Sequence, residues 1–381
     1  MRRSIGIDLG TTNSVVASNA QVLPLIDGDQ QSFLLPSVVG FLPNGGAMVG
    51  TEARCRRAFD PLNTIWSSKR LMGELWTSYA TRQFQNQYPH KLSACVEGQV
   101  QFETRAGAIN PTDIATLIVS HLCMRAQVRP SELHTVVTVP SSFREPARLA
   151  TTLALKQAGL TDLRLIEEPV ATAIAYLERS NLRYAAVYDL GGGTFDLAIV
   201  DCSSFPFRVL GHGGDPYLGG DDIDRALASM VAEKVLRSTG WDLMSEPVTF
   251  ARLVLFVERA KCELEKMDVA HVDITQVDPA APPMLTQVSI DRAMLHAAAT
   301  PLIRRTFGIC DEVLSEVKLH ARDLQAVFLA GGSTRLPMLA EMLNEYFSRR
   351  VRKDLDPEHV VALGASMTAA RPKLWPLLEV R

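Results

Sequence analysis

The sequence predicts an α/β protein composed of two related halves. Apolar, strand-like runs alternate with amphipathic helical segments along the chain, which is typical of α/β folds. One motif occurs twice, at residues 5–17 and again at residues 187–200. A length of 381 residues suggests two or three domains, so each half is long enough to form a domain of its own.

The repeated motif consists of an apolar strand, the tripeptide Asp-Leu-Gly, a turn of small residues and a second apolar strand. Its two aspartates, Asp8 and Asp189, are 181 residues apart, which is too far for a solenoid repeat and indicates a duplicated domain. Each copy is predicted to form a β-hairpin with a turn rich in glycine and threonine.

The chemistry of these turns points to an anion. Glycines let main-chain N–H groups approach a ligand, and consecutive small residues form a concavity that binds anions. Burying Asp8 and Asp189 without a partner would be costly, and a hydrated Mg²⁺ between them would supply one. The hairpins therefore predict a phosphate tail gripped from both halves, with two ordinary glycine-rich hairpins as the alternative. No GxxxxGK[ST] stretch occurs, which excludes a P-loop as the phosphate grip.

The other elements are predicted from apolar periodicity and from the positions of proline and glycine. Strands are expected at residues 135–139, 163–166 and 325–330. Helices are expected at residues 145–158, from residue 168 onward, and at residues 221–238 and 252–266. The glycine turn at residues 331–334 is expected to open a further helix, whose free N–H groups would face a ligand.

Composition excludes several classes of protein. With 39 Lys and Arg against 42 Asp and Glu, the net charge of −3 argues against nucleic acid or an anionic membrane as the main partner. No apolar run approaches ~20 residues, and Asp8 interrupts the first one, so neither a membrane span nor a secretory signal is expected. The six scattered cysteines show no metal spacing and predict isolated, mostly buried thiols in a reducing cytoplasm.

Taken together, the motifs make the sequence resemble the ATPase domain of the 70-kilodalton heat-shock chaperone family, within the actin-like ATPase superfamily. The matching stretches occur in family order at residues 5–14, 69–73, 137–140, 168–173, 189–196, 218–222, 258–261, 330–335 and 361–365. The resemblance implies a duplicated actin-like (ribonuclease H-like) fold, with two lobes each split into two subdomains around a nucleotide cleft. Lobe I is expected at residues 1–181 (insert about 38–108), lobe II at 182–353 (insert about 219–297), a returning helix at 354–373 and a linker-like tail at 374–381.

The resemblance implies slow, Mg²⁺-dependent hydrolysis of ATP to ADP. The residues expected to hold the phosphates are Gly10, Thr11, Thr12, Asn13, Gly191, Gly192, Gly193 and Thr194. Asp8 and Asp189 are expected to bind Mg²⁺ through waters. The residues expected to act in hydrolysis are Lys69, Glu168, Asp189 and Thr194, which suits phosphoryl transfer because positioning and charge stabilisation dominate its catalysis.

The remaining cofactor-binding residues implied by the resemblance are Gly219, Gly220, Glu258, Lys261, Glu265, Gly331, Gly332, Ser333 and Arg335. Glu258 and Lys261 lie three apart on one helical face and match a ribose-binding pair, with an ordinary surface ion pair as the alternative. Glu265 stands where the family usually has a small hydroxyl residue, so it either weakens the contact with the base or turns outward. Cys262 also departs from the family pattern.

The resemblance also implies partners. Arg164 matches an arginine that the family uses toward J-domain co-chaperones, and Pro140 and Arg148 match residues that relay the nucleotide state. Several neighbours depart from the family pattern, namely Ser142, Arg144, Glu145 and Glu167. A J-domain partner of altered charge and a nucleotide-exchange factor are therefore expected. Because residues 374–381 resemble the interdomain linker, the chain is expected to be a monomeric fragment without its peptide-binding domain, with a naturally short protein as the alternative.

Alternative functions share this fold, so analogy of fold alone cannot separate them. A nucleotide-binding regulatory module with negligible turnover is the second hypothesis, an actin-like filament protein the third, and a sugar kinase a remote fourth. Retention of Lys69, Glu168, Asp189 and Thr194 favours the chaperone ATPase over a module without turnover. The helix with Glu258 and Lys261, together with the linker-like tail, favours it over a filament.

Overall fold

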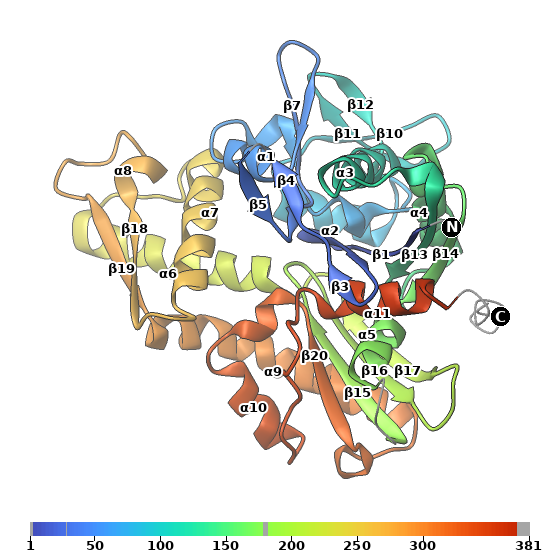
Figure 1. The fold of residues 1–381 in the computed structure, drawn as a ribbon. Helices are drawn as coiled ribbons and strands as arrows, with labels where there is room; N and C mark the ends of the chain where they lie inside the picture. The colour runs from blue at the N-terminus through green and yellow to red at the C-terminus, as the bar shows by residue number, and fades with distance from the viewer. Residues whose placement is uncertain (1–2, 28, 178–181, 372–381) are drawn as a thin grey trace.

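The computed structural model describes residues 3–27, 29–177 and 182–371 (Figure 1). It is a mixed α/β structure, as predicted, with two larger sheets and several small ones. The predicted tail at residues 374–381 lies outside the described residues.

The sheet of the first half has six strands, in the order β14-β13-β1-β2-β3, with β6 paired to β2. These strands are β1 (Arg3–Leu9), β2 (Asn13–Ser18), β3 (Gln21–Val22), β6 (Leu35–Pro36), β13 (Leu133–Val139) and β14 (Leu163–Glu167). β1 runs antiparallel to β2 and parallel to β13, so the first copy of the repeated motif is a hairpin within the sheet.

The sheet of the second half repeats this pattern in the order β17-β16-β15-β20. Its strands are β15 (Tyr184–Leu190), β16 (Phe195–Asp201), β17 (Arg208–Asp215) and β20 (Ala326–Ala330). β15 runs antiparallel to β16 and parallel to β20, just as β1 does with its two neighbours. The shared arrangement supports the predicted internal duplication.

Helices cover both faces of the two sheets, which explains why central strands such as β1, β13, β15 and β16 are largely apolar. The outer face of the first sheet packs on α3 (Pro111–Arg125) and α4 (Glu145–Gln157). The outer face of the second packs on α6 (Gly220–Thr239), α9 (Arg292–Glu316) and α10 (Leu339–Tyr346). Between the sheets lie α5 (Glu168–Leu177) and α11 (Val360–Ala369), which pack against each other (Figure 1).

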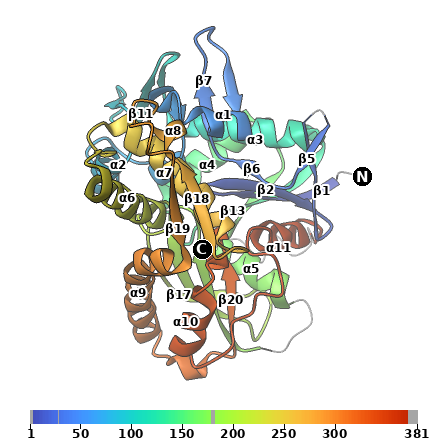
Figure 2. The ribbon, with the colours of Figure 1, turned by 90° about the vertical axis from the view of Figure 1, so that its left-hand side faces the viewer.

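Smaller elements surround these layers. Residues 25–109 contain β4 (Leu25–Asp27), β5 (Gln30–Ser32), β7 (Val39–Phe41), β8 (Ala47–Val49), α1 (Thr51–Arg56), β9 (Thr64–Ile65), α2 (Tyr79–Gln87), β10 (Leu92–Ala94), β11 (Val100–Thr104) and β12 (Gly107–Ile109). The second half adds α7 (Pro247–Glu263), β18 (Val269–Asp273), α8 (Ile274–Val277) and β19 (Gln287–Asp291). Figure 2 shows α7 lying beside the β18–β19 hairpin.

The predicted strands at residues 135–139, 163–166 and 325–330 are confirmed, as are the helices at residues 145–158 and 221–238, within one or two residues. The helix expected at residues 252–266 begins earlier, at Pro247, and ends at Glu263. The glycine turn does open a helix, but it is a 3₁₀ helix over Gly332–Arg335, and the α-helix α10 begins only at Leu339. Pro337 explains the delay, since it has no N–H to continue a helix.

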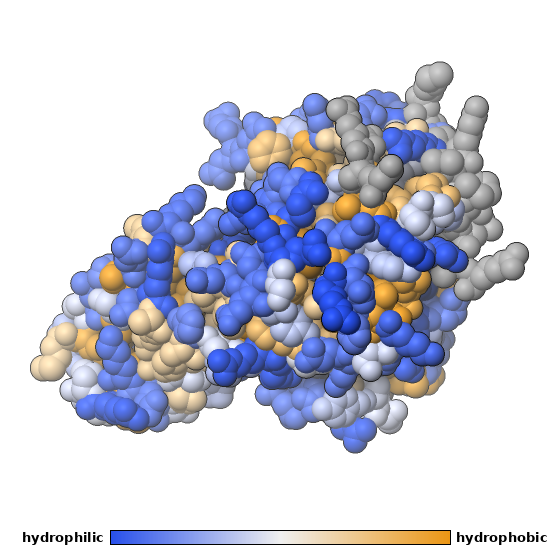
Figure 3. All heavy atoms as spheres, turned by 90° about the horizontal axis from the view of Figure 1, so that it is seen from below, coloured by the Kyte–Doolittle hydropathy of each residue, from blue (hydrophilic) through white to orange (hydrophobic). Residues whose placement is uncertain are grey.

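The cysteine prediction is half right. All six cysteines are free, but just three are buried, Cys123, Cys202 and Cys310. Cys55 and Cys262 are exposed, so their helices present them to solvent or to a cavity rather than to a core. Among the described residues, none of the helices combines the length and the apolarity that crossing a membrane requires. The face in Figure 3 shows hydrophilic side chains interspersed with small apolar patches.

Candidate functional site

A cavity of about 690 Å³ lies between the two halves and takes its lining from both. Nearly all of the predicted site residues line it: Asp8, Gly10, Thr11, Thr12, Asn13, Lys69, Glu168, Asp189, Gly191, Gly192, Thr194, Gly220, Glu258, Lys261, Glu265, Gly331, Gly332, Ser333 and Arg335. The exceptions are Gly193 and Gly219, which are not among the lining residues. These two glycines pack against each other, since a Cβ at Gly219 would lie 2.7 Å from the Gly193 nitrogen.

The turns of the two hairpins face one another across this cavity. A Cβ added at Gly192 would lie 1.9 Å from Thr12 Oγ1, so no residue but glycine fits between the turns without rearrangement. Thr12 Oγ1 is itself buried and has no hydrogen-bond partner among the described residues. A buried hydroxyl without a partner is costly, which makes this position suited to a ligand that accepts a hydrogen bond. Phosphate oxygens are such acceptors.

Three largely enclosed carboxylates lie beside the turns. Burial and, second, repulsion from Glu168 raise the pKa of Asp8 to about 6, although Thr138 Oγ1 donates a 2.8 Å hydrogen bond to Asp8 Oδ1. The same causes raise the pKa of Asp196 to about 7 and hold the pKa of Asp189 well above its usual value. Asp189 and Asp196 are directly paired across the second hairpin. The carboxylates are thus crowded and short of positive charge.

These oxygen donors fit Mg²⁺, which prefers hard oxygen ligands and retains several waters. In the described part of the chain, no three His, Cys, Asp or Glu side chains converge closely enough to enclose a metal ion directly. A hydrated ion held by two carboxylates suits this geometry better than a fully protein-bound ion.

A lysine supplies positive charge to the carboxylates. Lys69 Nζ donates to Glu168 Oε1 at 2.7 Å, and both side chains are 12% exposed. Burial by itself lowers the pKa of Lys69, but the charges of Glu168 and Asp8 outweigh burial and hold that pKa above its usual value. Lys69 is therefore a fixed cation, and Glu168 begins α5 directly beside it.

Arg70 is a site residue that sequence reasoning missed. Its side chain is 1% exposed, donates to the carbonyl of Gly193 and lies 4.0 Å from Asp221. The guanidinium carbon also sits over the rings of Tyr217, at 4.8 Å, and Tyr88, at 5.4 Å. Arg70 thus ties the first half to the second hairpin turn. Its position next to Lys69 was the sole signal in the sequence.

Farther along the cavity, Glu258 and Lys261 do not pair with each other. Glu258 accepts from Arg54 Nη2 at 2.6 Å and lies 3.8 Å from Arg57 Nη1, whereas Lys261 Nζ lies 2.8 Å from Asp224. Burial opposes ionisation of Glu258, but the charges of Arg54 and then Arg57 prevail and lower its pKa. The alternative of a simple Glu258–Lys261 ion pair is therefore wrong. The Arg54–Glu258 pair instead joins α1 of the first half to α7 of the second.

The glycine turn after β20 forms a further part of the cavity lining. Gly331 adopts a positive φ of 83°, which favours glycine, and Ser333 Oγ donates to the carbonyl of Gly191 at 2.8 Å. Arg335 is surrounded by carboxylates, with Asp356 at 2.6 Å, Glu358 at 3.5 Å and Glu265 at 3.7 Å. Of the two expected outcomes for Glu265, outward rotation is therefore not observed, because Glu265 lines the cavity and faces Arg335.

One of the departures near the expected co-chaperone surface, Glu167, lies in a polar network. Arg148 Nη2 lies 3.0 Å from Glu167 Oε1, and Ser141 Oγ donates to Glu167 Oε2 at 3.3 Å. The carboxylate that replaces the family's usual residue is thereby neutralised. Pro140, one of the two residues expected to relay the nucleotide state, lines the cavity next to this network.

Comparisons of sequence relate this chain to known proteins. A sequence model of the family described as Hsp70 protein matches residues 4–372. The chain is 39% identical over 378 residues to the chaperone protein HscA of Klebsiella pneumoniae (strain 342), in an alignment that covers 97% of this chain and 58% of that protein. It is also 39% identical to the HscA of Cronobacter sakazakii and 36% identical to an HscA homologue of Tolumonas auensis. The chain thus spans less than two thirds of the relatives it matches. By the match over almost its entire length, the chain belongs to the Hsp70 family.

Proposed function

We propose that this chain is the nucleotide-binding domain of an Hsp70-type chaperone and slowly hydrolyses ATP to ADP and phosphate with water as the nucleophile. The observation that carries the proposal is the pair of facing hairpin turns, with an orphaned hydroxyl at Thr12 and enclosed carboxylates at Asp8 and Asp189. Each half of the chain forms one lobe, divided in two by the inserts at about residues 38–108 and 219–297, and the cavity between the lobes is the nucleotide cleft.

At the phosphate end, residues 10–13 and 191–194 donate main-chain and hydroxyl hydrogen bonds to the phosphate oxygens. Asp8 and Asp189 would hold a hydrated Mg²⁺, which would supply charge that neutralises the phosphates. Lys69 stabilises negative charge that develops on the γ-phosphate, and Glu168 and Thr194 orient the attacking water. Preorganised charge of this kind is usually the largest contribution to catalysis.

At the other end, Glu258 and Lys261 face the ribose hydroxyls from α7, and the turn with Gly331, Gly332, Ser333 and Arg335 receives the adenine. Gly219 and Gly220 contribute the backbone between the second hairpin turn and α6. Glu265 approaches the base indirectly, through its contact with Arg335.

The proposed partners are those of the Hsp70 family. A further domain is proposed because the chain spans 58% of the HscA relative's length. A peptide-binding domain would read the nucleotide state through the segment at residues 374–381. A J-domain co-chaperone would bind near Arg164 and the Arg148–Glu167 pair, and a nucleotide-exchange factor would open the cleft. The domain is proposed to be a cytoplasmic monomer, with no nucleic-acid or membrane partner.

A single-turnover ATPase assay tests the proposal. We expect slow, Mg²⁺-dependent conversion of bound ATP to ADP, together with constant light scattering. Tight nucleotide binding without turnover would favour the regulatory module, and a nucleotide-dependent rise in scattering would favour a filament. Retention of the Lys69–Glu168 pair and both hairpin aspartates supports turnover over the regulatory module.

A further inference from the structure

Glu358 lies where the chain crosses from the second half to the first. The residue before it is fixed to the second half, because Gly331 N donates to the Pro357 carbonyl at 2.9 Å. Two residues later, α11 begins and packs against β1 of the first half. The Glu358 side chain is 22% exposed and lines the cavity. It is therefore placed to contact both halves at once.

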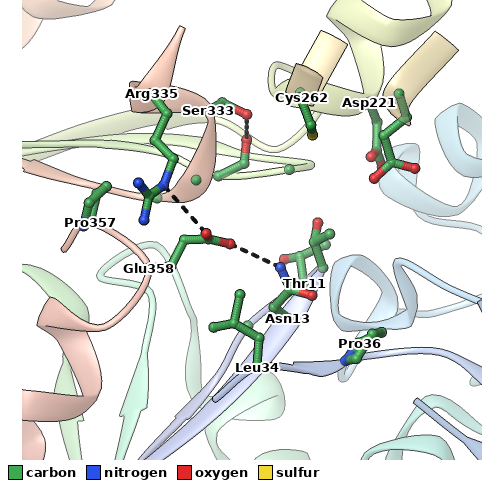
Figure 4. Close-up of a pocket in the computed structure, with 18 of the residues that line it drawn as sticks. Thr11, Asn13, Leu34, Pro36, Asp221, Cys262, Ser333, Arg335, Pro357 and Glu358 are labelled. Atoms are coloured by element: carbon green, nitrogen blue, oxygen red, sulfur yellow. Dashed lines mark hydrogen bonds and ion pairs between the residues drawn. The ribbon is translucent and has the colours of Figure 1, made fainter. Parts of the chain in front are cut away.

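The carboxylate does contact both, as Figure 4 shows. Glu358 Oε1 accepts a 3.1 Å hydrogen bond from Asn13 Nδ2 of the first hairpin turn, and Glu358 Oε2 lies 3.5 Å from Arg335 Nε. The contacts form an unbroken chain from the arginine at the base end to the turn at the phosphate end.

The position of this carboxylate is well defined. A Cβ at Gly332 would lie 3.0 Å from Glu358 Oε1, so the side chain rests directly on the glycine turn. Glu358 N also donates to Asp356 Oδ1 at 2.9 Å, which anchors the backbone. Arg335 has a shorter ion pair with Asp356, at 2.6 Å, and a longer one with Glu265, at 3.7 Å. The feature that separates Glu358 from these carboxylates is its bond to Asn13.

We propose that Glu358 is a positioning residue that makes the phosphate turn dependent on Arg335. With Arg335 in place, the negative charge of Glu358 is paired and its carboxylate orients Asn13. Without Arg335, an uncompensated anion stands beside the turn that would receive phosphates and repels them. Arg335 thereby supports phosphate binding without touching the phosphates, because it acts through Glu358. A base that binds Arg335 would in this way affect how tightly the hairpin turn binds phosphates. The inference rests on the proposed function, since it assigns phosphates to this turn.

Magnesium pyrophosphate, which has no base, is the probe that isolates this effect. We expect Arg335→Ala to weaken pyrophosphate binding about 5–10-fold, within the usual range of coupling between sites. Adding Glu358→Gln to Arg335→Ala should restore affinity to within about twofold of the parent chain, because the amide still accepts from Asn13 but carries no charge. Glu265→Gln is the matched control, since Glu265 contacts Arg335 but no contact joins it to Asn13 among the described residues. Glu265→Gln added to Arg335→Ala should not restore pyrophosphate affinity.

Unchanged pyrophosphate affinity in Arg335→Ala, or equal rescue by Glu265→Gln and Glu358→Gln, would overturn the proposal. A second measurement needs no ligand: amide hydrogen exchange of residues 10–14 in the unliganded chain. Glu358→Ala should accelerate exchange there about fivefold and Glu265→Gln should leave it unchanged, and equal rates in all three proteins would also overturn the proposal. If the parent chain bound neither ADP nor pyrophosphate, the proposed function would fail, and the exchange result alone would decide the role of Glu358.

Discussion

The two ends of the cavity are built differently. At the proposed phosphate end, the two hairpin turns meet closely, and Lys69 and Glu168, both 12% exposed, form a short ion pair. At the proposed base end, Arg335 is 34% exposed and lies among three carboxylates from two segments, Glu265 from one and Asp356 and Glu358 from the other. The first end is dense and highly constrained, whereas the second is open and carries an excess of negative charge.

This difference predicts how each end tolerates change. Buried charges that depend on one another make a substitution at the phosphate end expensive, because the remaining partner is left uncompensated. Partly exposed ion pairs are screened by water and contribute little individually. Substitutions at the phosphate end should therefore have large effects on catalysis and on Mg²⁺, and those at the base end should cause smaller changes in affinity.

The largest effect is expected from Lys69→Ala. Loss of one preorganised charge at a developing anion should slow single-turnover hydrolysis ~10²–10³-fold while nucleotide affinity stays nearly intact. Lys156→Ala, on the exposed side of α4, is the control and should hydrolyse ATP at the parent rate. A Lys69→Ala variant that matched the parent rate would remove Lys69 from catalysis and would contradict the contrast between the two ends.

Next in size is the effect of Asp8→Asn and of Asp189→Asn. Each substitution removes one of the two carboxylates proposed to hold hydrated Mg²⁺, so each should weaken the Mg²⁺ dependence of ADP binding ~10-fold or more. A Mg²⁺ titration at fixed ADP measures this by calorimetry or fluorescence. If both variants titrated like the parent chain, the clamp between the hairpins would be refuted.

The contrast also shows what sequence reasoning could reach. The phosphate end was predictable because Asp8, Thr12, Asp189 and Gly192 belong to two short motifs whose turn chemistry is local. The family order of motifs placed Lys69 and Glu168 in one site, but it did not predict the 2.7 Å ion pair between them. The base end depends instead on contacts between distant segments, such as Asn13 with Glu358, which are 345 residues apart.

The failures come from the limits of local patterns. Helical spacing offered Lys261 as a partner of Glu258, whereas the structure pairs Glu258 with Arg54 of α1, which lies 204 residues away in the chain. A contact over that separation leaves no trace in the spacing of residues on one helix. The α-helix expected after the glycine turn begins late for a different reason, because Pro337 has no N–H with which to continue the 3₁₀ helix at Gly332–Arg335.

Acidification offers a third test, aimed at the phosphate end. Mg²⁺ needs ionised carboxylates, and burial raises the pKa of Asp8 to about 6 and holds the pKa of Asp189 well above its ordinary value of 3.8. Protons therefore compete with the ion as pH falls, and the apparent Mg²⁺ affinity should drop ~10-fold per pH unit below about pH 6. Titrations at about pH 8, 7, 6 and 5.5 measure the trend on both sides of these pKa values. A flat profile over that range would contradict the enclosure of an ionisable Mg²⁺ site.

The Arg54–Glu258 ion pair, which joins the two halves of the chain, should give an effect of intermediate size. Arg54→Ala removes the 2.6 Å ion pair with Glu258, while Arg57 at 3.8 Å compensates in part. We expect ADP to dissociate about fivefold faster, because truncating one partner of a buried charge pair acts mainly on the dissociation rate. Arg56→Ala is the matched control, since Arg56 pairs with Asp60 inside the first half. Stopped-flow release of a fluorescent ADP that showed equal rates for both variants would assign no bridging role to Arg54.

The smallest effect is expected at Glu265, and it tests the openness of the base end most directly. Glu265 is 38% exposed and lies 3.7 Å from Arg335, so the ion pair is screened and contributes at most ~1 kcal/mol. Glu265→Gln removes one of three carboxylates that surround Arg335, which leaves the guanidinium freer to engage the base. ADP affinity should therefore change by less than about fivefold, toward tighter binding.

Paired titrations of Glu265→Gln with ADP and with pyrophosphate separate the two ends of the cavity. Pyrophosphate affinity should not change, because no contact joins Glu265 to the hairpin turns among the described residues. A screened ion pair cannot account for a large effect, so a loss of ADP affinity beyond ~10-fold would show that Glu265 binds the base itself. The base end would then be as constrained as the phosphate end, and the contrast between them would no longer hold.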